Sequence, residues 1–565
     1  MKYERSVSRL LCLLLIAALL LNLVGCTKPQ VPSTDPTGTA QTTVPTVPTT
    51  APTTVPTEPT VTEPTVLPTE PEPEKESLEY TLTQEDVDEF YRLLTECETL
   101  AIAGEDMEAI EAISDQLDAQ FELLQAQNSI AMILYYYNMA DEQKEEIHLE
   151  CVEICTDAQD AYMQAVRRIY LSETPAREML FEGWTEKDID LLLKYDERIS
   201  ELQQRNSKIE VDYRTAALDS VRIPLYIEFI NNNNEIAKIY GYDNYYTYSY
   251  DVVYNRDYGT KEVELMRQLA KEYLTVALGK YSIKFNKNFN ALSAKEQNNI
   301  VAFLYNEYSS IPVDYLGKYL DTMPGNLKQD TEYMLAYDSL FSYYSGSMSG
   351  AFTTTIADRS YCFFGADYSS VSTVVHEAGH YYASQYADLN TIPLDLAEVH
   401  SQGNEWLFLA TVGNTMKSSE FNATVNYLTY NNIAMILICL MVDEFEQKVY
   451  STDVSDFTAA DFDAIMDSIV TQYFDLEYAA ANLTDVNAYW RAVVVEQPIY
   501  YISYAVSVIA AMDLYNIAKE DFAAAAETYR KLCEEPLEDA GFLESISAVG
   551  LSGPFDEAFY KRLGG

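Results

Sequence analysis

The sequence predicts a mostly α-helical protein with one small β element. Gly, which is common in turn-rich and sheet-rich folds, occurs only 20 times in 565 residues. Only eight of the 20 prolines follow residue 80, so long helices can run between them. Apolar residues recur at helical spacing from the start of this region, at Val87, Phe90, Leu93, Leu94 and Cys97. The clearest strand signal is Tyr361-Cys362-Phe363-Phe364, so we expect the β element near residues 350–365.

The first 25 residues have the pattern of a secretory signal peptide. A positively charged start precedes an apolar run, Leu10 to Leu21, that is short for a membrane span. The following Leu23-Val24-Gly25-Cys26 resembles the lipobox of bacterial lipoproteins, in which the signal is cut before a Cys that is then lipidated. We therefore expect Cys26 to carry the lipid that anchors the chain to the membrane. The alternative is an ordinary secretory signal followed by a chance Cys.

Residues 26–79 are expected to be the lipidated Cys and a disordered spacer. Twelve of the 20 prolines lie here, interleaved with Thr. Residues 27–79 contain no aromatic residue, and the first one that follows is Tyr80. Such a composition favours extended polyproline II, at about 3.1 Å per residue, over a packed core. A spacer of this length suits a domain held beyond a Gram-positive cell wall. Residues 80–565 would then form the folded domain, with an N-terminal helical part at 80–230 and a catalytic part at 231–565.

The charge of the chain is strongly negative. The formal net charge is −51; residues 1–25 contribute +2 and residues 27–79 contribute −6, which leaves −47 for the folded part. A surface this acidic repels phosphate, so nucleic acid is excluded as a partner. It also favours cationic over anionic substrates. The six cysteines after residue 80 include no CxxC pair and are expected to be buried thiols.

The segment that predicts chemistry is His376-Glu377-Ala378-Gly379-His380. It contains two of the four histidines in the chain and has the HExxH pattern. On a helix, which Ser369-Ser370 can cap, residues i and i+4 share a face, so both imidazoles can bind one Zn²⁺. Glu377 is then the candidate general base that takes a proton from water. A structural coincidence is the alternative interpretation.

A hydrolytic zinc site needs a third protein ligand and one open position. Glu398 is the first candidate, because Pro393 ends the preceding segment and Leu394 to Leu409 has the pattern of a second helix. On that helix Glu398 can face back towards the metal. The rival is His400, which would point elsewhere two residues further along the helix.

Four blocks of sequence resemble the zinc oligopeptidases of the oligoendopeptidase F and thimet oligopeptidase family. They are Asn234 to Tyr245, the run from Ala351 through HExxH to His380, Ala397 to Glu405, and Pro498 to Ala505. The blocks follow one another in the order of the family and span about half of the chain. The third block resembles the family segment that holds the third ligand, a Glu, which falls on Glu398.

The resemblance implies a two-lobed helical peptidase with a deep central channel that admits unfolded peptides and excludes folded proteins. It implies Zn²⁺ as the cofactor and short peptides as the substrates. Residues 80–230 would form much of one lobe. The strand at Tyr361 to Phe364 would pair with the substrate backbone, so Tyr361 and Phe363 are expected substrate contacts.

The tyrosine-rich block implies the oxyanion donors. Tyr500 and Tyr504 lie one helical turn apart and are the candidate catalytic tyrosines, while Tyr501 is an expected substrate contact. The sequence does not decide which of the three stabilises the oxyanion. One departure stands out: the family usually carries a His a few residues before this Pro, and here we place Val493 at its position.

These observations favour a surface-anchored zinc metalloendopeptidase that hydrolyses short, unstructured peptides. A catalytically weakened or inactive peptide-binding lipoprotein on the same scaffold is the second hypothesis, and the missing His is its support. A structural or adhesive surface protein with a chance HExxH is the third.

Overall fold

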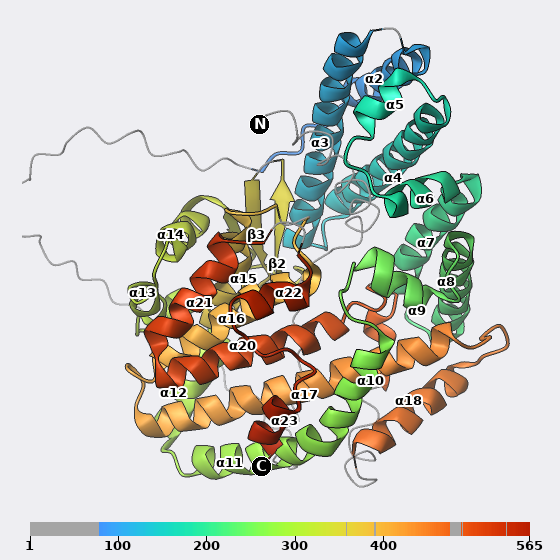
Figure 1. Ribbon diagram of the computed structural model, residues 1–565. Helices are drawn as coiled ribbons and strands as arrows, with labels where there is room; N and C mark the ends of the chain where they lie inside the picture. Colours follow the sequence, from blue (N-terminus) through green and yellow to red (C-terminus); the bar gives the residue numbers. More distant parts are fainter. Residues whose placement is uncertain are drawn as a thin grey trace, which may run out of the picture.

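The computed structural model describes residues 78–104, 106–357, 359–388, 391–474, 487–488, 490–495, 497–537 and 540–564. The predicted signal peptide, Cys26 and nearly all of the predicted spacer therefore lie outside the described residues. Helices dominate the rest, as the sequence predicts (Figure 1). The six cysteines after residue 80 are all free and buried, which confirms the expectation for them.

The N-terminal helices form a lobe that stands above the rest of the molecule in Figure 1. Its first helix begins after Thr83, whose side chain forms a capping box with Asp86. Val87, Phe90 and Leu93 bury their side chains in a core that α2, α3 and α4 share and that is separate from the main core. The helices are α2 (Gln84–Ala103), α3 (Met107–Tyr137), α4 (Glu142–Leu171), α5 (Pro175–Leu180), α6 (Glu186–Lys194), α7 (Glu197–Thr215) and α8 (Asp219–Tyr240).

Helix α8 connects this lobe to the rest of the molecule. The expected boundary at residue 230 falls inside α8, and Tyr226 and Ile230 already belong to the main core. After α8 come α9 (Tyr245–Tyr248), η1 (Ser249–Val253), α10 (Thr260–Leu269), η2 (Ala270–Leu274), α11 (Thr275–Asn290), α12 (Ala294–Tyr305), η3 (Tyr308–Ser310), α13 (Tyr315–Leu320) and α14 (Leu327–Tyr337).

The last third of the chain forms the centre of the main body. Its helices are α15 (Val371–Ser384), α16 (Leu394–Val412), α17 (Ser418–Tyr450), α18 (Ala459–Tyr473), α20 (Ile502–Glu520), α21 (Phe522–Glu534), α22 (Phe542–Ala548) and α23 (Glu557–Gly564). Helix α16 packs against α15 on one side and α20 on another. Among the described residues, α17 is the one helix long and apolar enough to cross a membrane. Over half of its most apolar window is buried in the protein, as in a core helix.

A three-stranded sheet lies between the N-terminal lobe and α15. It consists of β1 (Ser339–Phe341), β2 (Ala351–Ile356) and β3 (Arg359–Phe364) in the order β1-β3-β2. Strand β3 pairs with β1 in parallel and with β2 antiparallel. Phe352, Tyr361 and Phe363 pack against α3, whereas Cys362 and Phe364 belong to the main core. The sheet therefore joins the two parts of the molecule beside the HExxH helix, where the β element was predicted.

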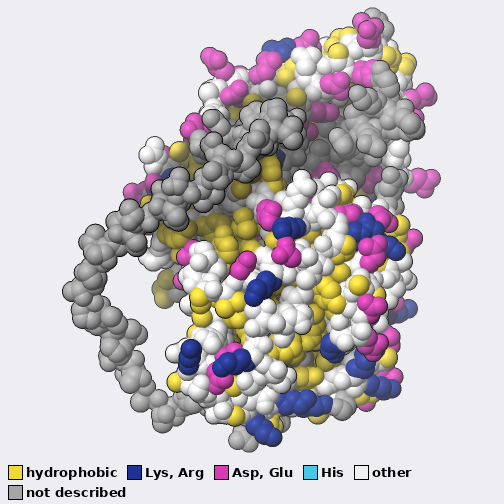
Figure 2. All heavy atoms as spheres, turned by 90° about the vertical axis from the view of Figure 1, so that its left-hand side faces the viewer, with side chains coloured by type: hydrophobic (Ala, Val, Ile, Leu, Met, Phe, Trp, Pro, Cys, Tyr) yellow, Lys and Arg dark blue, Asp and Glu magenta, His cyan; other side chains and the backbone are white. Residues whose placement is uncertain are grey.

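Figure 2 shows the side of the molecule that is on the left in Figure 1. On this side the surface is hollowed between the lobe and the main body. Hydrophobic side chains are gathered at this hollow, and acidic side chains stand out on the lobe above it. Two lobes around a hollow agree with the fold that the sequence predicts.

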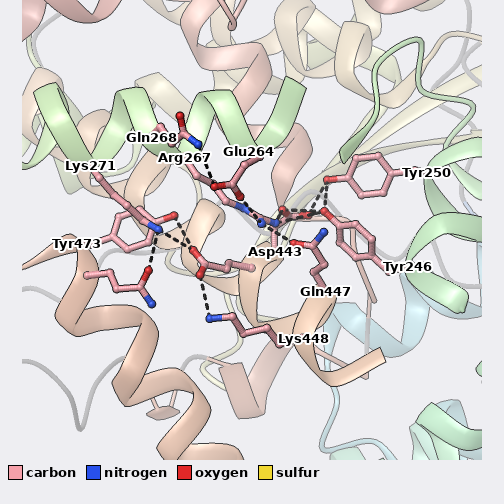
Figure 3. Close-up of polar contacts among 12 residues, drawn as sticks. Tyr246, Tyr250, Glu264, Arg267, Gln268, Lys271, Asp443, Gln447, Lys448 and Tyr473 are labelled. Carbon is pink, nitrogen blue, oxygen red and sulfur yellow. Dashed lines mark hydrogen bonds and ion pairs between the residues drawn. The ribbon is translucent and has the colours of Figure 1, made fainter. Parts of the chain in front are cut away.

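A buried ion pair ties α10 to α17 within the main body (Figure 3). The guanidinium of Arg267 contacts the carboxylate of Asp443, and the two side chains are 2% and 1% exposed. Asp443 also accepts hydrogen bonds from the hydroxyls of Tyr246, at 3.1 Å, and Tyr250, at 2.7 Å. Nη1 of Arg267 donates to Gln447 at 2.5 Å, and Nε has no hydrogen-bond partner among the described residues. The charge of each partner is thus compensated without water, which makes the pair costly to break.

We expect Asp443→Ala to lower the free energy of unfolding by about 3–5 kcal/mol, because it leaves the Arg267 charge buried without its partner. Denaturant unfolding followed by circular dichroism measures the change. The matched control is Glu235→Ala, which removes the partner of Arg198 from an ion pair whose side chains are 49% and 45% exposed. That change should cost about 1 kcal/mol or less. Equal losses in the two variants would contradict the importance of the buried pair.

Candidate metal centre

The HExxH segment lies on α15, which begins as the sequence predicts. The Ser370 hydroxyl accepts a hydrogen bond from the backbone N–H of Thr373 and so caps the helix. His376 and His380 lie one turn apart, with ring centroids 5.1 Å from each other. Both are buried, at 3% and 4% exposure.

Gly379 allows α16 to approach this helix closely. A Cβ atom at Gly379 would lie 2.4 Å from the backbone oxygen of His400 and 2.7 Å from the Cα of Ser401. Such distances are not possible, so any side chain here would push the two helices apart. The amide of Asn404 secures the contact by donating to the backbone oxygen of Val375 at 2.7 Å.

The close approach brings Glu398 of α16 to the two histidines. One ligand atom from each of His376, His380 and Glu398 lies within 4.8 Å of the others, and all three residues are buried. Among the described residues this is the group of His, Cys, Asp or Glu side chains arranged to hold a metal ion. It is the set that we predicted, whereas the rival His400 does not belong to it.

The same three side chains fit a metal ion chemically. The Nε2 atom of His376 is buried and has no hydrogen-bond partner among the described residues. It lies 3.8 Å from Oε2 of Glu398, too far for a hydrogen bond. A buried imidazole nitrogen without a partner is costly unless something binds it. Two imidazoles and one carboxylate are a common ligand set of catalytic zinc.

Glu405 orients His376 from the outer side. Its carboxylate lies 2.7 Å from Nδ1 of His376 and also accepts a hydrogen bond from Ser372 at 2.8 Å. A carboxylate in this position fixes the ring and leaves Nε2 to face Glu398. Burial lowers the pKa of His376, but Glu405 together with the charges of Glu377 and Glu398 raises it, and the net shift is upward. The sequence analysis missed this role, although Glu405 lies seven residues, or two turns, after Glu398 on the same face of α16.

Glu377 faces the sheet. It is 1% exposed, and its Oε2 accepts a hydrogen bond from the hydroxyl of Thr353 on β2 at 2.8 Å. Burial raises the pKa of Glu377 to about 7, although His376 and Thr353 act in the opposite direction. A carboxylate with such a pKa can both take and return a proton near neutral pH.

His400 is buried away from this group. Its backbone oxygen accepts a hydrogen bond from Tyr529 at 2.7 Å, and its ring nitrogens have no hydrogen-bond partner among the described residues. Burial is the main cause that lowers its pKa to about 4. His400 therefore packs as a neutral side chain between α16 and α21.

Of the three candidate tyrosines, Tyr500 contacts the group directly. Its hydroxyl donates to Oε1 of Glu398 at 3.2 Å and lies 3.3 Å from the hydroxyl of Tyr504. Tyr501 contacts both through its ring, with centroids 5.6 Å from Tyr500 and 6.0 Å from Tyr504. All three are at most 3% exposed. Val493, at the place expected for the missing His, is buried in the main core.

The expected role of Tyr361 and Phe363 does not agree with the sheet. Strand β2 pairs along the whole of β3, and β1 pairs with Cys362 to Phe364 on the other edge, so the backbone of Phe363 has no edge left for another chain. The side chains of Tyr361 and Phe363 are 6% and 0% exposed and pack towards α3. A hydrophobic run shows that a strand is buried but not which edge it occupies. Within the described residues, the strand with an outer edge beside Glu377 is β2.

Comparisons with known proteins address the fold. No family model and no curated protein matches the sequence. Solved structures do match. A structure described as an oligoendopeptidase F from Bacillus anthracis is 16% identical, with a TM-score of 0.64, and covers 86% of this chain and 96% of its own. PZ peptidase A with an inhibitor is also 16% identical, with a TM-score of 0.64, and the match covers 84% of this chain and 95% of that one. Oligoendopeptidase-F from Enterococcus faecium is 12% identical, with a TM-score of 0.54, and the match covers 85% of this chain and 96% of that one. The chain therefore has the oligoendopeptidase fold, as the sequence resemblance implies.

We expect Glu398→Ala to lower zinc occupancy, because it removes one of the three buried ligands. Glu377→Gln is the matched control: it also changes a buried Glu of the site, but its side chain is not in the ligand group and zinc should remain bound. Elemental analysis of both proteins after dialysis measures the difference. Full occupancy in Glu398→Ala, together with loss of zinc in a His400→Gln variant, would make His400 the third ligand.

Proposed function

We propose that this protein is a zinc-dependent endopeptidase that hydrolyses short, unstructured peptides. The observation that carries the proposal is the buried group of His376, His380 and Glu398, with Glu377 beside it on the HExxH helix. The fold supports it, because solved structures with this fold are described as oligoendopeptidases and peptidases. When bound, zinc would supply Lewis-acid polarisation of water and of the scissile carbonyl.

The chain itself supplies the proton transfer and the positioning. Glu377 accepts a proton from the attacking water and returns it to the leaving amine, for which its pKa of about 7 is suited. Thr353 holds the Glu377 carboxylate through a hydrogen bond. Glu405 holds His376 in the tautomer that presents Nε2 to the metal. Tyr500, whose hydroxyl lies 3.2 Å from Oε1 of Glu398, can stabilise the oxyanion of the tetrahedral intermediate.

The substrate would bind in an extended form along the outer edge of β2. This edge strand holds Thr353 next to Glu377, so a peptide paired with it passes close to the general base. Only an unfolded segment can add to a sheet edge in this way. The −47 charge of the folded part would favour cationic peptides through long-range attraction.

A catalytically weakened peptide-binding protein is the second candidate. The observation that favours it is Val493, a buried apolar side chain where the resemblance implies a hydrogen-bonding His. The loss of one donor to the transition state typically costs about 2.7–4 kcal/mol. The metal ligands and Glu377 are retained, so we favour activity.

We expect the zinc-loaded protein to cleave quenched-fluorescence peptides of about 5–20 residues, a range that follows from the family resemblance, and to lose this activity with a chelator. Glu377→Gln should bind zinc but lower kcat by at least about 10²-fold, because the amide cannot accept the proton. Steady-state kinetics with zinc analysis measure both. Near-normal kcat in Glu377→Gln would remove Glu377 as the base, and zinc-bound but inactive wild-type protein would favour the peptide-binding function.

The same assay tests the class of substrate. A folded protein of matched charge should remain intact, and efficient digestion of it would contradict the requirement for an extended peptide. For basic peptides, kcat/KM should fall with salt more than for acidic peptides of equal length, since the Debye length shrinks from about 10 Å at 0.1 M to about 3 Å at 1 M.

We also propose that Cys26 is lipidated and anchors the enzyme to the outer face of the cell membrane, most simply of a Gram-positive cell. The lipobox-like sequence and the Thr/Pro-rich spacer support this proposal. We expect Cys26→Ala to move the protein from the membrane fraction to the soluble fraction, as Western blots of fractionated cells would show. Cys12→Ala, within the signal peptide, is the matched control and should stay with the membrane. Membrane retention of Cys26→Ala would contradict lipid anchoring.

A further inference from the structure

The residue that precedes Tyr500 has an unusual backbone conformation. Ile499 has φ = 63°, in the left-handed region that a β-branched side chain rarely adopts. Its side chain is fully buried. Such a conformation persists only where the surroundings hold it in place, and it is commonly found at functional sites.

Both sides of the Ile499 peptide unit are bound by buried side chains. Its N–H donates to Oε1 of Glu446 on α17 at 2.8 Å, and its carbonyl oxygen accepts from Nη2 of Arg256 at 2.9 Å. The carbonyl of the preceding Pro498 accepts from the hydroxyl of Tyr254 at 2.8 Å. Three side chains, two from the segment after η1 and one from α17, thus fix two successive residues directly before Tyr500.

Arg256 connects this loop to the helix that carries the metal ligand. Its side chain is 1% exposed, and its Nε lies 3.7 Å from Oδ2 of Asp395. Asp395 lies on α16 one turn before Glu398, the residue that accepts the hydrogen bond of Tyr500. The guanidinium also donates to Ser503 at 3.1 Å. Arg256 therefore contacts both elements whose separation sets the distance between Tyr500 and Glu398.

The surroundings of Arg256 leave it little freedom. Its guanidinium carbon lies 4.4 Å from the ring centre of Tyr250 and 4.3 Å from that of Tyr254. The hydroxyl of Tyr258 donates to the same oxygen of Asp395, Oδ2, at 2.7 Å. A planar guanidinium that lies against two aromatic rings and directs Nη2 to both Ile499 and Ser503 makes contacts that an ammonium group would not reproduce.

We propose that Arg256 is a positioning residue for Tyr500: together with Glu446 it holds Ile499 in the left-handed conformation and so places the Tyr500 hydroxyl at the metal-ligand group. This inference rests on the proposed function, in which Tyr500 stabilises the oxyanion. In this role Arg256 acts on the metal-ligand group through Tyr500. A role in folding alone would instead affect the enzyme whether or not the Tyr500 hydroxyl is present.

A double-mutant cycle separates these two roles. Arg256→Gln, Tyr500→Phe and the double variant are compared by steady-state kinetics at saturating zinc. We expect Tyr500→Phe to lower kcat about 10²-fold and Arg256→Gln to lower it about tenfold or more, with little change in KM. In the Tyr500→Phe background, Arg256→Gln should lower kcat less than twofold. Equal losses in both backgrounds would overturn the proposal.

Glu446 provides a second pair of variants should Arg256→Gln fail to fold. Glu446→Gln keeps an oxygen that can accept from the Ile499 N–H, whereas Glu446→Leu removes it at similar volume. We expect kcat near the wild-type value in Glu446→Gln and a loss of about tenfold in Glu446→Leu, which should again vanish in the Tyr500→Phe background. Equal activity of the two Glu446 variants would contradict a role of this hydrogen bond in placing Tyr500.

Zinc affinity gives a readout that does not depend on peptidase activity. Tyr500 donates to the ligand Glu398, and loss of such a partner typically weakens metal binding 10- to 100-fold. Chelator competition should show weaker zinc binding in Tyr500→Phe and in Arg256→Gln, with no further loss in the double variant. Zinc-bound but inactive wild-type protein would refute the proposed function alone. Additive losses of zinc affinity would refute the positioning role.

Discussion

The contact between α15 and α16 at Gly379 is the constraint on which the metal centre depends. The two helices approach until backbone meets backbone, because Gly379 has no side chain to keep His400 and Ser401 away. Any larger residue would move α16 outward and carry Glu398 with it. A displacement of about an ångström is enough to spoil a site whose ligands must converge on one ion. The glycine of the HExxH segment is thus as necessary to the site as the ligands, although it contributes no chemistry itself.

The acidic composition imposes a second constraint. Some buried carboxylates have no Lys or Arg close to them in the sequence to compensate their charge. The structure meets it with cations brought from other elements. Arg267 of α10 compensates Asp443 of α17, and Arg256 lies beside Asp395 of α16. These contacts bring residues 246–267 against α16, α17 and the loop before α20. The elements that hold the metal centre are therefore fixed by long-range polar contacts as well as by apolar packing.

Local features of the site could be predicted from the sequence, whereas contacts between distant segments could not. The shared face of His376 and His380 follows from helical periodicity, and the serines before the helix predict its cap. Glu398 is the first candidate on the predicted second helix, and the family resemblance also places the third ligand there. The order of the strands does not, because Tyr361 to Phe364 has the same apolar pattern whether β3 is an edge or an inner strand. Arg256 was missed because nothing in its neighbourhood along the chain indicates that it meets Ile499, 243 residues later. The oligoendopeptidase fold was predicted through the resemblance of four short blocks, not through periodicity.

The loop directly before Tyr500 has a strained backbone that its surroundings hold in one position. A left-handed β-branched residue costs about 1–3 kcal/mol, and the contacts of Tyr254 and Arg256, from the segment between η1 and α10, and of Glu446, from α17, must offset that cost. The strain coincides with the loop that brings the Tyr500 hydroxyl to Glu398, and with a buried Val493 at the place expected for a His. In the function that we propose, the His donor is missing and the Tyr500 hydroxyl must therefore be held firmly to contribute to catalysis. The contacts that hold the Ile499 peptide serve that requirement.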